Sequence, residues 1–176
     1  MPRLIHLNGP TGVGKSTLAA RYAAGHPLTL NLDADEIVRL VGGWRDDFFA
    51  TVDLVRPLAI TMATHHLATG HDVVMPQLVT NLGQRAAFAG AATAAGARYV
   101  EVVLLAPRDT AIERFRARSH PIDEVVERLG GAALIHRVYD DLAAYLTPEA
   151  TVVETGQDGP DAAYEALLAA LGETGT

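Results

Sequence analysis

The pattern G-x-x-x-x-G-K-S occupies residues 9–16, and it constrains the fold of this chain more than any other feature. It contains Lys15, the only lysine among 14 basic residues; the other 13 are arginines. Glycines at these spacings let a backbone curl so that its N–H groups point inward at an anion. The pattern is typical of loops that wrap the phosphate groups of a nucleotide.

The segments on either side of this loop fit the same interpretation. Residues 3–8 have the apolar pattern of a short buried strand, and residues 16–24 fit a helix. The start of that helix adds partial positive charge beside the loop. Lys15 is expected to reach between the β- and γ-phosphates of ATP, and the Ser16 hydroxyl to hold Mg²⁺. The residues of this segment expected to contact ATP are Gly9, Thr11, Gly12, Val13, Gly14, Lys15, Ser16 and Thr17.

Two classes of nucleotide-binding protein are disfavoured by simple counting. A guanine-specific site needs a lysine in an N-K-x-D motif, and the only lysine already lies in the loop. A motor ATPase needs an acidic residue at the end of a strand, yet the best candidate strand, residues 72–75, runs into Pro76. A GTP switch and a motor protein are therefore poor hypotheses.

Composition narrows the possibilities further. The net charge is −7, which argues against a nucleic-acid partner, and the absence of cysteine excludes disulfides and thiolate metal sites. No apolar run reaches the roughly 18 residues that a membrane span needs, and the first residues do not resemble a signal peptide. We therefore expect a cytoplasmic protein without a membrane partner.

Two acidic residues follow the second expected strand, residues 28–32. Asp33 and Asp35 would stand at the carboxyl end of that strand, which is the edge where open α/β sheets bind ligands. One carboxylate could order Mg²⁺ while the other accepts the proton of a hydroxyl group. Asp33 with Glu36 also fits a capping box that opens a helix, so a cap and a site could coincide.

A phosphate loop near residue 10, followed by a strand ending in Asp-x-Asp, resembles the small-molecule P-loop kinases. Shikimate kinase and gluconate kinase share this arrangement, and chloramphenicol phosphotransferase, the tunicamycin-resistance protein and the zeta-toxin kinases have related layouts. Strands expected at 3–8, 28–32, 72–75, 99–105 and 151–154, with helices between them, predict a parallel sheet. The resemblance implies a three-layer α/β P-loop fold with strand order 2-3-1-4-5, helices on both faces, and one domain over residues 1–176 with a short lid at about 118–132.

The same resemblance assigns roles to residues in the second half of the chain. Arg114 and Arg118 would share one face of a helix and would stack on adenine or clamp the transferring phosphate. The alternative is that they are solvated arginines at a helix end. Gly156, in the turn after the last strand, would contact the adenine through its backbone.

The acceptor site is the least constrained part of the sequence. Trp44 and Arg45, in an insert between two helices, are the main candidates for acceptor binding; Asp35 and Gln77 are the others. The single tryptophan could form an exposed aromatic wall or belong to the packed core.

These observations predict an ATP- and Mg²⁺-dependent phosphotransferase that moves the γ-phosphate to a hydroxyl of a small molecule. An antibiotic, and hence a role in resistance, is the first expectation for the acceptor. Two alternatives stay open: a nucleotide or nucleotide-sugar kinase of the zeta-toxin type, and a non-catalytic regulator that binds ATP.

Overall fold

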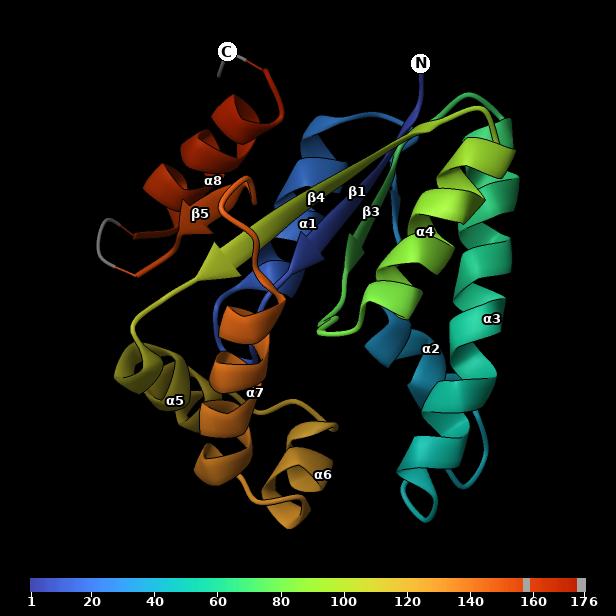
Figure 1. Cartoon of the computed structure of the whole chain (residues 1–176). Helices are drawn as coiled ribbons and strands as arrows, with labels where there is room; N and C mark the ends of the chain where they lie inside the picture. The colour runs from blue at the N-terminus through green and yellow to red at the C-terminus, as the bar shows by residue number, and fades with distance from the viewer. Residues whose placement is uncertain (157–158, 174–176) are drawn as a thin grey trace.

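The computed structural model describes residues 1–156 and 159–173, and its five parallel strands form one sheet in the order β2-β3-β1-β4-β5 (Figure 1). This confirms both the predicted α/β class and the predicted strand order. The strands are β1 (Arg3–Asn8), β2 (Leu30–Asn31), β3 (Val73–Pro76), β4 (Arg98–Leu105) and β5 (Val152–Glu154). The helices are α1 (Lys15–Gly25), α2 (Ala34–Leu40), α3 (Phe48–Ala68), α4 (Leu82–Ala94), α5 (Arg108–Ala117), α6 (Asp123–Arg128), α7 (Ala132–Tyr145) and α8 (Gly159–Ala170).

Successive residues of the central strands belong to two separate hydrophobic cores, one on each face of the sheet. Ile5 of β1 packs in the core formed with α1 and α8, whereas Leu4 packs in the core formed with α3 and α4. In β3, Val74 faces the first core and Met75 the second. Because side chains alternate along a strand, apolar residues at every position mean that both faces are covered. The result is the expected three-layer arrangement.

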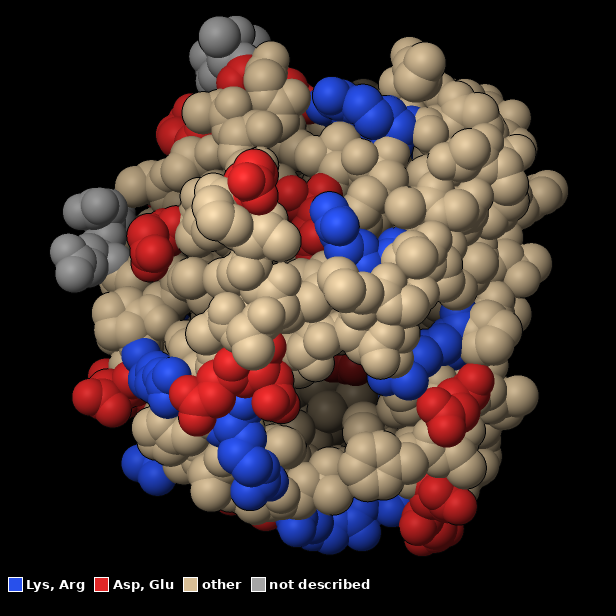
Figure 2. Space-filling model, in the orientation of Figure 1, with Lys and Arg blue, Asp and Glu red and all other residues tan. Residues whose placement is uncertain are grey.

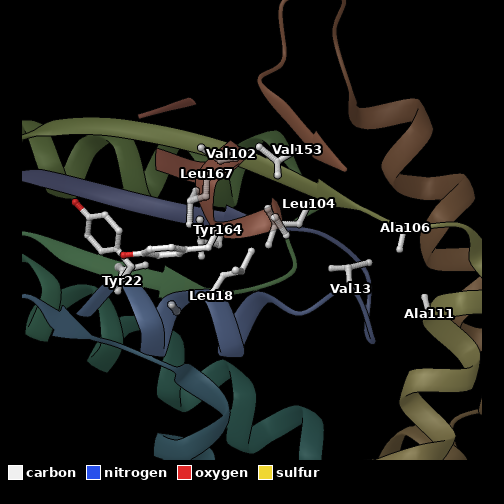
Figure 3. Close-up of a cluster of buried hydrophobic side chains, with 14 of the residues drawn as sticks. Val13, Leu18, Tyr22, Val102, Leu104, Ala106, Ala111, Val153, Tyr164 and Leu167 are labelled. Carbon is white, nitrogen blue, oxygen red and sulfur yellow. The ribbon is translucent and has the colours of Figure 1, made fainter. Parts of the chain in front are cut away.

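The first core holds the helix that follows the glycine-rich loop. Figure 3 shows Leu18 of α1 and Leu167 of α8 packed near Val102 and Leu104 of β4. All four side chains are almost completely buried. Burial of a leucine side chain is worth about 2 kcal/mol, so this contact fixes α1, and with it the loop, against the sheet.

The second expected strand is shorter than predicted. Leu28 has a left-handed backbone conformation with φ 66°, and Thr29 N–H donates to the His26 carbonyl in a turn, so only β2 is extended. At the other end Asp33 already begins α2.

No helix among the described residues is long and apolar enough to cross a membrane.

Candidate active site

The glycine-rich loop leaves β1 and enters α1 through glycines that no other residue could easily replace. Gly9, Gly12 and Gly14 have φ of 144°, 88° and 95°, which lie in the region that favours glycine. A Cβ at Gly12 would collide with the backbone of Ala111 in α5, whose carbonyl carbon would lie 2.8 Å away. The loop is therefore curled, as the sequence predicted, and it is also closely packed against α5.

Alanine substitutions at Gly12 and Gly70 should distinguish the cost of this close approach from the cost of backbone strain. Gly70 has φ 92°, close to that of Gly12, but a Cβ there would meet nothing within 4 Å. Gly70→Ala should cost about 1–3 kcal/mol through strain alone. Gly12→Ala should cost more, and should also weaken ADP binding. Urea unfolding of both variants tests this; equal losses of stability would contradict the close packing of the loop.

Lys15 lies at the start of α1 and turns back over the loop. Its Nζ donates a hydrogen bond to the Pro10 carbonyl oxygen at 2.8 Å. Burial lowers the pKa of Lys15 to about 8; the nearby Asp35 and Asp33 act against this shift, whereas Arg118 adds to it. The ammonium group is thus held in the loop at low hydration, within the field of both carboxylates.

Asp33 occupies two roles at once. Its Oδ1 accepts from the backbone N–H of Asp35 at 3.1 Å and caps α2, while its Oδ2 accepts from the Ser16 hydroxyl at 2.8 Å. Glu36 does not complete a capping box; its carboxylate instead accepts from Arg39 at 2.7 Å. One side chain therefore caps α2 and also contacts Ser16, which ties α2 to the first turn of α1.

Asp35 lies beside this pair but is not engaged in the same way. Among the described residues, no side chain or backbone N–H donates to its carboxylate. Surrounding protein raises the pKa of Asp35, and Asp33 raises it further; Lys15, His120 and Arg118 act against the shift. A carboxyl group with a raised pKa and no partner is the kind of group that accepts and releases protons.

These residues lie at the carboxyl ends of the strands. Figure 2 shows a hollow in this part of the surface, between α2 and α7 and above α6, with acidic atoms at its upper rim and basic atoms on both sides. Ligands of open α/β sheets bind at this edge.

Arg114 and Arg118 do not share a helix face, contrary to the prediction. Helix α5 ends at Ala117, and Arg118 is extended with ψ 162°. The Nη2 of Arg114 donates to the Gly156 carbonyl oxygen at 3.4 Å, whereas the Nε of Arg118 donates to both carboxylate oxygens of Asp123 at 3.1 Å. The two arginines therefore point to different parts of the site.

Arg114 lines a cavity of about 270 Å³ between the loop and the start of α8. Thr155 closes one side, and its hydroxyl donates to the Val13 carbonyl at 2.8 Å. The residues around this cavity are Val13, Gly14, Thr17, Leu18, Arg114, Thr155, Pro160 and Ala163. Four predicted ATP contacts (Val13, Gly14, Thr17 and Arg114) thus meet at one cavity, and Gly156 follows Thr155 directly.

Arg118 lines a second cavity, of about 450 Å³, together with Arg45 and His120. His120 was missed by sequence reasoning; its Nε2 lies 3.2 Å from a Glu36 carboxylate oxygen and links the segment after α5 to α2. The guanidinium of Arg45 lies 4.4 Å from the centre of the Trp44 ring and 3.5 Å from the Glu124 carboxylate.

Trp44 belongs to the packed core. Only 6% of the residue is exposed, and it packs in the same core as Ile37 of α2 and Val125 of α6. The exposed aromatic wall, one of the two possibilities at the sequence level, is not what the structure shows. Trp44 instead supports the segment that carries Arg45.

Gln77 follows β3 and is anchored by its backbone. Its N–H donates to the Leu7 carbonyl at 3.1 Å, and its carbonyl oxygen lies 2.8 Å from His6 Nε2. Its side-chain Oε1 is buried and has no hydrogen-bond partner among the described residues. A buried acceptor without a partner costs free energy unless a ligand or a water molecule supplies a donor.

Comparisons with known proteins agree with this arrangement. The sequence profile described as AAA domain matches residues 4–134. A sugar kinase from Janibacter sp. has a TM-score of 0.64 and 15% identity, over 98% of this chain and 95% of that one. The tunicamycin resistance protein of Deinococcus radiodurans has a TM-score of 0.63 and 17% identity, over 98% and 96%. Shikimate kinase from Bacteroides thetaiotaomicron has a TM-score of 0.62 and 19% identity, over 97% and 98%.

No curated protein sequence matches the chain significantly. The matched profile nevertheless covers most of the chain, and it includes the glycine-rich loop, both aspartates and the two arginines. The chain therefore belongs to the AAA domain family, and it has the fold of the small-molecule P-loop kinases.

Proposed function

We propose that the chain is an ATP-dependent phosphotransferase that moves the γ-phosphate to a hydroxyl group of a small molecule. The observation that carries the proposal is the Asp35 carboxylate beside Lys15, which accepts no hydrogen bond from the described part of the chain, next to an Asp33 that is engaged with Ser16. A site that only binds a nucleotide needs the loop and its lysine, but it does not need the Asp35 carboxylate. A carboxylate with a raised pKa beside the loop is suited to taking a proton from an acceptor hydroxyl.

The nucleotide would lie along the loop from Gly9 to Thr17. Backbone N–H groups and Lys15 would hold its phosphates, and the 270 Å³ cavity beside Arg114 and Gly156 would hold its base. Ser16 and Asp33 are the residues that fit Mg²⁺, because a hydroxyl and a carboxylate oxygen already meet there at 2.8 Å. Bound Mg²⁺ would neutralise charge on the phosphate oxygens.

Asp35 would act as the base. Its carboxylate would orient the acceptor hydroxyl and take its proton as the hydroxyl oxygen attacks the γ-phosphorus. The bond from the γ-phosphorus to the bridging oxygen breaks, and that oxygen leaves with ADP. Lys15 and Arg118 would stabilise the negative charge of the transferring group.

The acceptor would enter from the 450 Å³ cavity. Arg45 and Arg118 line it, and the segment from 118 to 132, which includes α6, would form its lid. The cavity also contains Asp123, Glu124 and Glu127, so both charge signs are present. Such a lining suits an acceptor with several polar groups. Gln77 does not line this cavity, but its Oε1 has no hydrogen-bond partner among the described residues and would accept from a ligand group that reaches the end of β3. An antibiotic alcohol is the first class to test.

The test is ADP formation from Mg-ATP with a panel of alcohols. The panel should contain antibiotics with free hydroxyls, sugars, and nucleotide sugars, with water alone as the baseline. One acceptor that raises ADP formation well above this baseline and carries the phosphate by mass spectrometry would support the proposal. Tight Mg-ATP binding with no transfer to any alcohol would favour a non-catalytic regulator.

The pH dependence of kcat/KM for ATP should be bell-shaped. Lys15 is needed as the cation, so the rate should fall as the pH rises through about 8, where Lys15 loses its proton. Asp35 is needed as the carboxylate. Because its pKa is raised, the rate should fall on the acid side at a pH above the usual aspartate value of about 3.9.

A Lys15→Arg variant provides the control for the basic limb, because arginine keeps its proton throughout this range. Whatever activity this variant retains should not fall near pH 8. A wild-type profile that stays flat from pH 7 to 10 would contradict the assignment of Lys15.

A further inference from the structure

Asn8 is a polar side chain in the interior of the protein. It is the last residue of β1, directly before the loop, and none of it is exposed to solvent. A buried amide is costly unless all its hydrogen-bonding groups are paired. Its partners therefore show what it holds in place.

All four hydrogen-bonding positions of the Asn8 amide are used. Its Oδ1 accepts from the backbone N–H of Gly9 and from that of Val79, each at 2.8 Å. Its Nδ2 donates to the Val79 carbonyl oxygen at 2.7 Å and to Oε1 of Glu101 at 2.8 Å. An amide offers two acceptor and two donor positions, so this side chain is saturated.

Glu101 determines the orientation of the Asn8 amide, that is, the positions of its oxygen and its nitrogen. This residue of β4 has a side chain that is only 11% exposed, and its carboxylate accepts from Arg85 Nε at 2.8 Å and from the Tyr145 hydroxyl at 2.8 Å. A carboxylate that accepts from these groups presents an acceptor, not a donor, to Asn8. The amide nitrogen must therefore face Glu101, and the oxygen must face the two backbone N–H groups.

The contacts join Gly9 to Val79, which both lie beyond the last backbone hydrogen bond between these segments, from the Gln77 N–H to the Leu7 carbonyl. The pairing of β1 with β3 ends at Leu7 and Pro76, one residue before Asn8. Beyond that point the Asn8 side chain links the start of the phosphate loop, at Gly9, to Val79. Val79 lies two residues after Gln77, whose buried Oε1 has no partner among the described residues.

We propose that Asn8 is a positioning residue that fixes the acceptor-side segment 77–79 relative to the phosphate loop. The inference rests on the proposed phosphotransferase function and adds a requirement to it. The loop that holds the phosphate donor, ATP, and the segment that meets the acceptor alcohol move as one unit. A misplacement of about 1 Å between two reacting groups can reduce a rate about 100-fold.

The test uses the full chain with four variants. Asn8→Asp keeps the oxygen that faces Gly9 and Val79 but places a second oxygen against the Val79 carbonyl and Glu101. The double variant Asn8→Asp, Glu101→Gln restores a donor opposite that second oxygen, and Glu101→Gln alone completes the cycle. Asn81→Asp is the matched control: within the described residues the Asn81 side chain acts only through its oxygen, which caps α4 and which aspartate retains.

Transfer to the panel alcohol and transfer to water are both measured with Mg-ATP. Asn8→Asp should reduce kcat with the alcohol about 10- to 100-fold, while transfer to water and the KM for ATP change much less. The double variant should regain about tenfold, and Asn81→Asp should match wild type. A merely structural role would lower both transfers together. Equal losses with alcohol and water, or no recovery in the double variant, would overturn the proposal.

Hydrogen exchange supplies a readout that needs neither a variant nor activity. If the two segments move as one, Mg-ATP added to the wild-type chain should slow exchange of the Val79 amide, as it slows that of Gly9. Protection of Gly9 without any change at Val79 would overturn the inference even if Asn8→Asp does not fold. Absence of phosphate transfer by wild type would instead overturn the proposed function, and would leave this coupling result intact.

Discussion

Lys15→Met is expected to reduce phosphoryl transfer by about 10³-fold or more, and to weaken ATP binding as well. Lys15 is the one ammonium group that the chain places inside the curled loop, within the field of Asp33 and Asp35. Removing one preorganised charge-stabilising donor from an active site costs about 10²–10³ in rate, and a fully charged one at the transferring phosphate costs more. ADP formation and calorimetric titration with Mg-ATP measure the two effects.

The fold should survive this change. Burial lowers the pKa of Lys15, which means that holding the charge there costs folding stability, so a neutral side chain of similar length should leave the midpoint of thermal unfolding unchanged or higher. Arg98→Met is the matched control: it also removes one positive charge, but from the exposed first residue of β4, at the opposite end of the sheet from the loop. Full transfer by Lys15→Met would end the kinase hypothesis.

Asp35→Asn should reduce transfer about 10²–10⁴-fold while leaving most of the ATP affinity. Asparagine keeps the shape of the side chain but cannot take a proton from the acceptor. Because the surrounding protein and Asp33 raise the pKa of Asp35, the ionised group is disfavoured in the folded state, and its neutral replacement should not destabilise the protein. Kinetics with the panel alcohol measure the loss of transfer, and thermal unfolding measures the change in stability.

Two comparisons make this result specific. Asp33→Asn should act differently, by raising the Mg²⁺ concentration needed for half-maximal rate, because Asp33 faces Ser16. Asp141→Asn, on the exposed surface of α7, should change neither the rate of transfer nor the Mg²⁺ concentration needed for the half-maximal rate. If Asp33→Asn abolished transfer at saturating Mg²⁺ while Asp35→Asn retained it, the roles of the two carboxylates would be reversed.

Features that depend on neighbouring residues could be predicted from the sequence. The curl of the loop follows from glycines at positions 9, 12 and 14, which reach φ values that other residues avoid. The capping role of Asp33 was also foreseeable, because it directly precedes α2, whereas its contact with Ser16 joins residues that are 17 positions apart in the chain. The strand order was implied by the resemblance, and the structure confirms it.

Features that depend on the ends of elements or on distant contacts could not be predicted. A continued helical repeat would have kept Arg114 and Arg118 together, but α5 ends one residue before Arg118, which then turns to Asp123. Trp44 is buried in a core to which α6, roughly eighty residues later in the chain, also contributes Val125. No periodic pattern in the sequence contains that information.

The polar residues in the strands show the same division. Asn8 and Glu101 stand out in the sequence as polar side chains inside apolar strands, but their partners are not visible there. The pairing of β1 with β4 brings them close, and the segment after β3 supplies Val79. Sequence alone thus determined the curled glycine-rich loop, the lysine at the start of α1 and the start of α2 at Asp33, because local backbone conformation places them. Only the tertiary structure decided which arginine faces which cavity and which amide joins the two loops, because those contacts arise from packing between segments far apart in the chain.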